Sequence, residues 1–328
     1  MVGAALVGGT GMWGPRLAEA AARTASLRLV SCFNRDDERR TAFAAERGIE
    51  AAPSLEAAIE HPDVEVVLLA TPNDLHAEQA IACADRGRHV FVEKPIADRL
   101  DAAAAMRDRF ERDGLVLAVG HELRRLGAAR RVKRLVDDGA LGTVVLAEAN
   151  WSMPSRLTPA AWRWYRDQAP GGPLLQLGIH HADTLAYWLG PIAESSGRFA
   201  HLVTEAEIDD VGIVDVRFES GAVGVVSGSY VSPRTYYLRL YGDRATLAYD
   251  VDLSVWPRAE QVDAATTLTL RTEDGAEAVE FEHCDPLAEQ LEELARAVRG
   301  ECSFETGPDE GIAALRVVLD AVPERAAR

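Results

Sequence analysis

Short apolar runs recur along the first 120 residues, and this repetition constrains the fold more than any other feature of the chain. The runs cover residues 2–7, 27–33, 64–70, 89–92 and 115–119, and most are separated by stretches of helical composition such as the alanine-rich residues 12–23. Runs that are apolar on both sides and separated by single helices are typical of a parallel sheet covered on both faces. The sequence therefore predicts a doubly wound α/β domain.

The pattern changes after Gly120. An arginine-rich helix is predicted over residues 124–138, a strand over 144–151, and a further helix after Gly171-Gly172-Pro173. Residues 199–281 alternate between apolar and polar in short segments separated by turn sequences, which predicts a meandering, mostly antiparallel sheet. Helices are predicted over 286–298 and 309–321.

A glycine-rich turn follows the first apolar run. Gly9, Gly11 and Gly14 form the pattern G-x-G-x-x-G, with Met12 and Trp13 between the last two. Between a strand and a helix, these glycines let backbone amides and the positive end of the helix dipole approach a pyrophosphate. A turn without a ligand is the alternative, but this position favours dinucleotide binding.

The end of the second predicted strand bears on which dinucleotide binds. Asn34 stands about 20 residues beyond the last glycine of the motif, where NAD-binding folds usually carry an acid for the ribose hydroxyls. Asn34 can bond a hydroxyl, while Arg35, with Arg39 and Arg40 a turn later, can bind a 2′-phosphate. This favours NADP over NAD. Alternatively, Arg39 and Arg40 pair with the acids at 36–38 on a solvated helix face.

Two further polar segments end predicted strands, at the sheet edge where ligands of such folds collect. They are Thr71-Pro72-Asn73-Asp74-Leu75-His76 and Glu93-Lys94-Pro95. Asn73 or Asp74 is expected to cap the following helix. The proline biases Lys94 toward extended backbone, which predicts an amine that points into the cleft and can exchange protons. A surface lysine is the alternative.

The helix after Gly171-Gly172-Pro173 carries two adjacent histidines. At about 100° per residue, Gln176, His180, Asp183 and Tyr187 share one face. His181 falls on the opposite, apolar side, so we expect a packed ring there. His180 shares its face with Asp183, which can orient it. A purely structural polar stripe is the alternative.

Composition narrows the class of partner. The chain has 35 basic and 52 acidic side chains, a net charge of −17, which repels phosphate backbones and anionic lipid. We expect no nucleic-acid or membrane partner. The apolar residues 2–11 lack a basic leader and are shorter than the roughly 20 residues that span a bilayer, which predicts a cytoplasmic protein. The four cysteines form no C-x-x-C pair, so no metal site is expected.

Together the four motifs, which begin at Gly9, Thr71, Glu93 and Gly171, resemble the Gfo/Idh/MocA family. This family contains the dinucleotide-dependent glucose-fructose oxidoreductase and inositol dehydrogenase group. The resemblance covers nearly the whole chain. It implies a dinucleotide-binding Rossmann domain over residues 1–121, and a substrate-binding and oligomerisation α+β domain with a large open, mostly antiparallel sheet over 122–328. The last helix is expected to pack back on the first domain, and a homodimer or homotetramer to form through the sheet.

The resemblance also implies roles for single residues. Lys94 would lie beside the nicotinamide, His180 would exchange a substrate hydroxyl proton, and Asp183 would contact substrate or position His180. Cofactor contacts are expected from Gly9, Gly11, Met12, Trp13, Gly14, Asn34, Arg35, Thr71, Pro72, Asn73, His76, Glu93 and Lys94. Weaker candidates for substrate binding are His121, Arg163, Trp164 and Gln176. Inositol-dehydrogenase-like members have an aspartate where this chain has Gln176, which cannot accept a proton as a carboxylate does.

The sequence thus predicts an NAD(P)-dependent oxidoreductase, leaning toward NADP, that transfers a hydride between nicotinamide and a carbohydrate-like substrate. The reacting group would be a secondary alcohol or ketone of a sugar, polyol, inositol or related cyclic compound. Two alternatives are open. One is a catalytically silent dinucleotide-binding sensor or regulatory protein. The other is nicotinamide-dependent elimination or glycoside cleavage without net redox.

Overall fold

A computed structural model describes residues 1–254 and 261–323, and the chain divides into two compact units. The first unit comprises Met1–Glu122 and Pro286–Ile312, and the second comprises Leu123–Asp285 and Ala313–Arg328. The sequence-based division assigned all residues after 121 to the second domain. The helix at Pro286–Val298 instead groups with the first unit, where Glu292 accepts hydrogen bonds from the backbone amides of Ala25 and Ser26.

The first unit is built on a six-stranded parallel sheet with the strand order β3-β2-β1-β4-β5-β6. This is the order of a doubly wound dinucleotide-binding fold. The strands are β1 (Val2–Val7), β2 (Leu27–Phe33), β3 (Glu50–Ala51), β4 (Val66–Leu69), β5 (His89–Glu93) and β6 (Leu117–Gly120). The helices are α1 (Gly14–Arg23), α2 (Asp37–Arg47), α3 (Leu55–Glu60), the 3-10 turn η1 (Asn73–Leu75), α4 (His76–Ala84), α5 (Leu100–Asp113) and α8 (Pro286–Val298).

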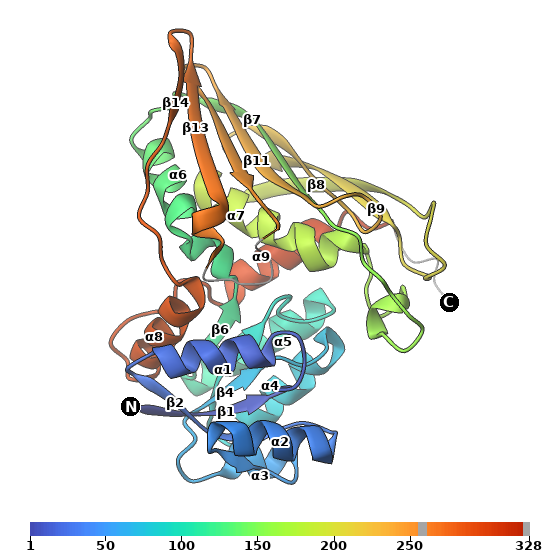
Figure 1. The fold of residues 1–328 in the computed structure, drawn as a ribbon, viewed down its shortest axis with the longest axis vertical. Helices are drawn as coiled ribbons and strands as arrows, with labels where there is room; N and C mark the ends of the chain where they lie inside the picture. Colours follow the sequence, from blue (N-terminus) through green and yellow to red (C-terminus); the bar gives the residue numbers. More distant parts are fainter. Residues whose placement is uncertain (255–260, 324–328) are drawn as a thin grey trace. The chain divides into compact units, whose positions relative to one another are not determined.

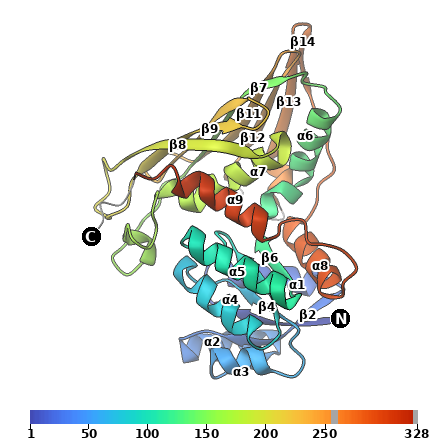
Figure 2. The same cartoon turned by 180° about the vertical axis from the view of Figure 1, so that it is seen from behind.

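Helices cover both faces of this sheet. Helix α1 lies in front of it in Figure 1, and α4 and α5 lie in front of it in Figure 2. Every residue of β1, β4 and β6 is buried. Such two-sided burial is why these strands are continuous apolar runs in the sequence. The five predicted runs correspond to β1, β2, β4, β5 and β6, which confirms the predicted fold class.

The second unit contains an eight-stranded sheet with the order β14-β13-β12-β11-β7-β10-β9-β8. Only the pair β7 and β10 is parallel among the described strands of this sheet, which confirms a mostly antiparallel arrangement. The strands are β7 (Val144–Ser152), β8 (Ile192–Ala200), β9 (Val211–Phe218), β10 (Val223–Ser229), β11 (Thr235–Gly242), β12 (Thr246–Val251), β13 (Thr266–Thr272) and β14 (Gly275–Ala278). The other elements of this unit are α6 (Gly127–Asp137), η3 (Trp162–Trp164), η4 (Leu174–Gly178), α7 (Ile179–Leu189) and η6 (Asp263–Ala265). Two more, η2 (Glu122–Arg125) and α9 (Pro308–Leu319), begin in the first unit and end in the second.

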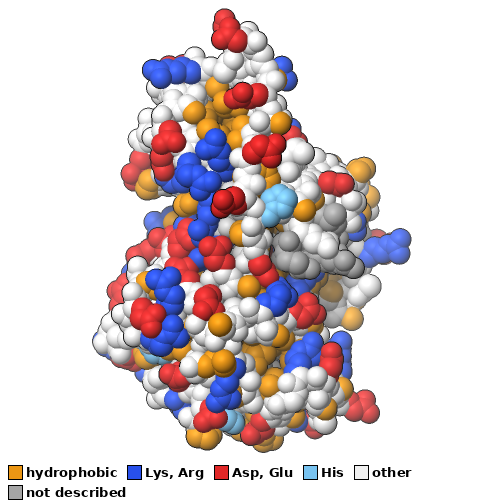
Figure 3. All heavy atoms as spheres, turned by 60° about the vertical axis from the view of Figure 1, so that its left-hand side comes forward, with side chains coloured by type: hydrophobic (Ala, Val, Ile, Leu, Met, Phe, Trp, Pro, Cys, Tyr) orange, Lys and Arg blue, Asp and Glu red, His pale blue; other side chains and the backbone are white. Residues whose placement is uncertain are grey.

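One face of this second sheet packs on helices and the other is open. Burial alternates along β9, where Val214 and Val216 are buried and Asp215 and Arg217 are exposed. Helix α7 contacts β7 and also α6, to which it is joined by the indole of Trp188. On the side of the molecule drawn in Figure 3, acidic and basic side chains are interspersed over the surface. Within the two described ranges, 1–254 and 261–323, the helices are all too short or too polar to cross a membrane.

Candidate functional site

The glycine-rich turn between β1 and α1 brings separate backbone segments into close contact. A Cβ atom at Gly14 would lie 2.4 Å from the carbonyl carbon and oxygen of Gly9, so only glycine lets α1 begin this near the turn. Gly8, outside the predicted motif, has a φ of +85°, and a Cβ there would lie 2.5 Å from the backbone oxygen of Ala70. Trp13, the residue before α1, makes no side-chain hydrogen bond that caps the helix. The amides of the first turn of α1 are therefore available to an anion.

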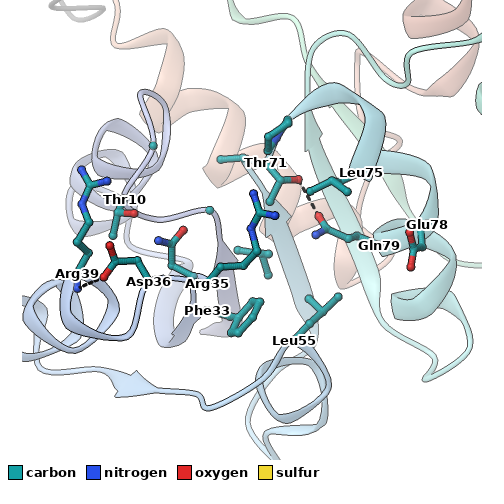
Figure 4. Close-up of a pocket in the computed structure, with 16 residues that line it drawn as sticks. Thr10, Phe33, Arg35, Asp36, Arg39, Leu55, Thr71, Leu75, Glu78 and Gln79 are labelled. Carbon is teal, nitrogen blue, oxygen red and sulfur yellow. Dashed lines mark hydrogen bonds between the residues drawn. The ribbon is translucent and has the colours of Figure 1, made fainter. Parts of the chain in front are cut away.

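A pocket of 490 Å³ opens beside this turn, within the first unit (Figure 4). It lies at the carboxyl ends of β1, β2 and β4, where ligands of doubly wound folds bind. Five of the predicted cofactor contacts line it, namely Gly11, Asn34, Arg35, Thr71 and Pro72. The other lining residues are Val7, Gly8, Thr10, Phe33, Asp36, Arg39, Leu55, Ala70, Leu75, Glu78 and Gln79.

The three arginines after β2 have different environments. Arg35 and Arg39 line the pocket, and Figure 4 shows Arg39 beside Thr10. For the part of the chain that the structure describes, no carboxylate lies within 4.0 Å of either guanidinium. Arg40 is buried, and its Nη1 donates to the Asn34 carbonyl at 3.0 Å and pairs with Asp37 at 2.7 Å. Of the two arginines that the alternative paired with the acids at 36–38, only Arg40 therefore forms such an ion pair among the described residues.

The segment after β4 differs from its prediction at the helix start. Neither Asn73 nor Asp74 caps a helix through its side chain, because the chain first forms the 3-10 turn η1 and α4 begins only at His76. His76 is fully buried, with Nδ1 2.9 Å from the Pro95 oxygen and Nε2 3.0 Å from the Thr71 oxygen. In this conformation His76 holds two loops together and has no surface for a cofactor. Asn73 is also buried.

Lys94 directly follows β5, and the bond to Pro95 is cis. The Lys94 side chain is largely buried, and its Nζ lies 5.9 Å from the centre of the Trp13 ring. Trp13 is the residue before α1, and Met12 beside it is exposed. Within the first unit, Lys94 therefore lies next to the glycine-rich turn.

Glu93 turns into the protein instead. Its Oε2 lies 3.2 Å from the position that a Cβ of Gly120 would occupy. Burial, with a smaller contribution from the neighbouring Glu122, raises the pKa of the Glu93 carboxyl to about 8, against the opposing effects of Lys94 and Arg16. A buried carboxyl of this kind is neutral at pH 7 and does not present a surface charge to a cofactor.

The two histidines of α7 are both buried, so burial does not separate them as the helical face predicted. The segment before them, η4, is a π-helix with one more residue per turn, so the 100° spacing does not extend back to Gln176. The Trp151 ring lies against both histidines: its centre is 5.3 Å from the centre of the His180 ring and 6.0 Å from that of the His181 ring. His181 also packs on Tyr236, and burial lowers its pKa to about 4. His181 is therefore a neutral packed ring, as expected.

Asp183 forms a buried ion pair in the second unit. Both of its carboxylate oxygens accept hydrogen bonds from the guanidinium of Arg124, at 3.0 Å from Nε and at a shorter contact from Nη2. The Arg124 guanidinium also lies 5.2 Å from the Tyr187 ring centre. The sequence placed Asp183 on the face of His180 but gave no sign of this partner, which is 59 residues away.

The weaker substrate candidates fall into different settings. Arg163 donates from Nε to the Oε1 of Gln176 at 3.2 Å. Trp164 packs against an apolar cluster of the second unit, and its backbone carbonyl accepts a hydrogen bond from the Glu207 amide. His121 is buried directly after β6 in the first unit.

Several pocket residues belong to no motif. Leu55 lies on α3, a helix of six residues that is too short to give a periodic signal. Gln79 accepts a hydrogen bond from the Thr71 hydroxyl at 2.7 Å. The only signal for Gln79 was its position one turn after the polar segment at 71–76.

Comparison with known proteins agrees with this geometry. Residues 2–121 match the family described as "Oxidoreductase family, NAD-binding Rossmann fold", and residues 129–248 match "GFO/IDH/MocA C-terminal domain". The 1,5-anhydro-D-fructose reductase of Ensifer adhaerens is 32% identical over 208 residues, a match that spans only 62% of either chain. The D-xylose 1-dehydrogenase (NADP(+)) 2 of Haloferax volcanii is 30% identical over 301 residues, 89% of this chain and 88% of that one.

Among solved structures, a protein from Desulfitobacterium hafniense DCB-2 described as a "putative nadph-dependent oxidoreductase" superposes with a TM-score of 0.94. It is 34% identical, and the match covers 98% of this chain and 94% of that chain. The two family matches together span more than half of the chain. The protein is therefore a member of the GFO/IDH/MocA family of oxidoreductases, as its four motifs predicted.

Proposed function

We propose that this protein transfers a hydride between a nicotinamide dinucleotide and a secondary alcohol or ketone of a sugar, polyol, inositol or related cyclic compound. The observation that carries the proposal is the pocket at the glycine-rich turn, with Lys94 beside Trp13 at the same turn. Two relatives named above are, by their names, a sugar reductase and a sugar dehydrogenase.

The residues of the first unit fit a dinucleotide. The uncapped amides of α1 suit a pyrophosphate, and the absence of a Cβ at Gly14 keeps the turn tight. Arg35 and Arg39 line the pocket without a carboxylate partner in the described residues, so we propose NADP as the preferred cofactor. When bound, the nicotinamide supplies the site that accepts or donates the hydride.

We propose that Lys94 and His180 handle the proton. When a secondary alcohol is oxidised, its hydroxyl loses a proton as its C–H bond breaks. In this proposal the imidazole of His180 takes up that proton, and Lys94 assists the proton transfer. Asp183 is committed to Arg124, so we propose that it acts on the site by holding α7 in place.

A screen of polyols, aldoses, inositols and dihydrodiols with NAD and NADP, followed by nicotinamide absorbance, tests the proposal. A stoichiometric absorbance change is expected with at least one substrate. Turnover without cofactor consumption would instead assign elimination or glycoside cleavage. Dinucleotide binding without any turnover would assign a regulatory protein.

The proton-handling roles give a sharper prediction. Lys94→Met should lower kcat by about 10²-fold or more, the usual contribution of a general acid or base, while cofactor Kd changes only a few-fold. His180→Ala should lower kcat far more than His181→Phe, because the His181 ring is a packed, neutral group. Steady-state kinetics and cofactor titration measure both. A near-normal kcat in Lys94→Met would remove the lysine from the mechanism.

We also propose that the protein forms a homo-oligomer through the open face of the second sheet. Ile213 and Val223 are exposed there, on neighbouring strands β9 and β10. Light scattering of the purified protein measures its mass directly. The cytoplasmic location expected from the sequence stays a prediction.

A further inference from the structure

Arg163 is a partly desolvated cation in the second unit. It lies in η3 between Trp162 and Trp164, and both tryptophans pack against an apolar cluster formed by Ala169, Ala206, Ile208 and Tyr230. The Trp162 ring centre is 4.3 Å from the guanidinium carbon. This packing holds the arginine in place, and burial lowers its pKa. Its guanidinium nevertheless stays protonated at neutral pH.

Among the described residues, this cation has no acidic partner. Over residues 1–254 and 261–323, no carboxylate oxygen lies within 4.0 Å of the Arg163 guanidinium. The nearest arginine in the chain, Arg166, does have one, because it pairs with Asp209 at 3.3 Å. Taking a charge partly out of water costs free energy unless an opposite charge or hydrogen-bond partners compensate. The positive charge at Arg163 is therefore available to a ligand.

Gln176 holds Arg163 without neutralising it. The amide oxygen of Gln176 accepts from the Arg163 Nε at 3.2 Å, and Gln176 itself is only 5% exposed. An aspartate or glutamate at this position would form an ion pair, whereas an amide leaves the full charge in place. Within the described chain, Nε makes the one side-chain hydrogen bond of this guanidinium. The Nη1 and Nη2 edge can then bind two oxygens side by side.

We propose that Arg163 binds a carboxylate of the substrate, so that the protein acts on acidic sugars or polyols in preference to their neutral counterparts. This rests on the proposed function, because it names the substrate class of the same enzyme. A carboxylate matches the planar guanidinium fork, and the bond gains strength where water is partly excluded. Because the chain carries a net charge of −17, an anionic substrate needs such a local cation.

Matched substrate pairs test the proposal. Glucuronate against glucose, and gluconate against glucitol, differ by a carboxylate at one carbon, and nicotinamide absorbance gives kcat/KM for each. The expected result is an acid-to-neutral ratio of kcat/KM well above one. Binding is measured separately by tryptophan fluorescence, since Trp162 stacks on the arginine.

Three variants assign the preference to this residue pair. Arg163→Met should lower the acid-to-neutral ratio by roughly 10-fold to 100-fold, the range of a charge-assisted hydrogen bond. Gln176→Asp keeps the arginine and its packing but supplies an internal counter-ion, so it should shift the preference toward neutral substrates. Arg166→Met removes the same charge from the same loop outside the pair and should leave the ratio unchanged.

The outcomes separate this proposal from the proposed function. Turnover of neutral sugars with no gain for their acids would overturn the carboxylate site and leave the oxidoreductase standing. If no substrate changes the nicotinamide absorbance, the proposed function fails. The carboxylate site is then tested by tryptophan fluorescence alone. Saturable binding of glucuronate that is lost in Arg163→Met supports the carboxylate site, and the absence of such binding overturns that site.

Discussion

Arg35 and Arg40 are five positions apart, but their surroundings give them different tasks. Arg35 lines the pocket, whereas Arg40 is buried and held by the Asn34 carbonyl and Asp37. We expect Arg35→Ala to weaken NADPH binding on the order of 10-fold more than NADH binding, because only NADPH carries the extra phosphate. Fluorescence titration with both dinucleotides measures the two Kd values.

The control for this prediction is Arg28→Ala, which removes an exposed arginine of β2 that pairs with Asp63. It should change neither Kd. An equal loss for both dinucleotides in Arg35→Ala would contradict the 2′-phosphate contact and leave Asn34 as a plain ribose ligand.

His76 shows a different constraint at the scale of one residue. Both ring nitrogens face carbonyl oxygens, but a neutral imidazole has one N–H, and burial lowers the pKa of His76. His76→Ala removes the ring and leaves a cavity and an unpaired buried carbonyl. We expect the free energy of unfolding to fall by about 3 kcal/mol, measured by urea denaturation. A loss below about 0.5 kcal/mol would show that the two loops hold each other without it.

At the scale of elements, sequence periodicity predicted the strands and helices whose apolar residues are buried. Strand β1 is buried throughout and coincides with the predicted run, and α8 coincides with the predicted helix at 286–298. Strand β3 has two residues and α3 has six, so neither gives a period to detect. The π-helical turn η4 also left no signal, because its identity depends on the backbone and not on residue type.

The ion pair that joins η2 to α7 leads to a prediction about these elements. Arg124→Met leaves the Asp183 carboxylate buried without its guanidinium, so the free energy of unfolding should fall by about 3–5 kcal/mol. The double variant Arg124→Met/Asp183→Leu removes both charges and should recover most of that loss. Urea unfolding measures all three proteins.

The same double variant tests whether Asp183 has a role beyond packing. If stability returns but kcat stays low, the carboxylate or the guanidinium acts on the reaction. A single-variant loss below about 1 kcal/mol would mean that the pair is not the buried contact seen here.

At the scale of the molecule, the candidate site was predictable where chemistry follows a motif. The glycine-rich turn and the segment at Thr71–Pro72 meet around one pocket because parallel strands end at the same sheet edge. The motifs did not reveal how side chains pair: Glu93 turns inward, His76 binds two carbonyls, and Asp183 binds Arg124. Such pairings depend on residues far apart in sequence, which local pattern cannot report.

Buried titratable groups make the stability of the whole molecule depend on pH. Burial raises the pKa of Glu93 to about 8, helped by Glu122 and opposed by Lys94 and Arg16. A raised pKa stabilises the folded state below the unfolded value of 4.5, and this stabilisation is lost as pH rises toward about 8, because only the unfolded chain ionises in that range. His181 acts in the opposite sense. Its pKa falls from 6.5 to about 4, so it destabilises the fold only below pH 6.5.

Between pH 6.5 and 8 the Glu93 effect therefore acts without that of His181. At about 1.4 kcal/mol per pH unit, the free energy of unfolding should fall by roughly 2 kcal/mol across this interval. Glu93→Gln carries no titrating proton and should lose that slope. Urea midpoints at several pH values measure both proteins. Parallel slopes in the two would show that Glu93 ionises in the folded protein as it does in water, and that the carboxyl is not as deeply buried as its 3% exposure indicates.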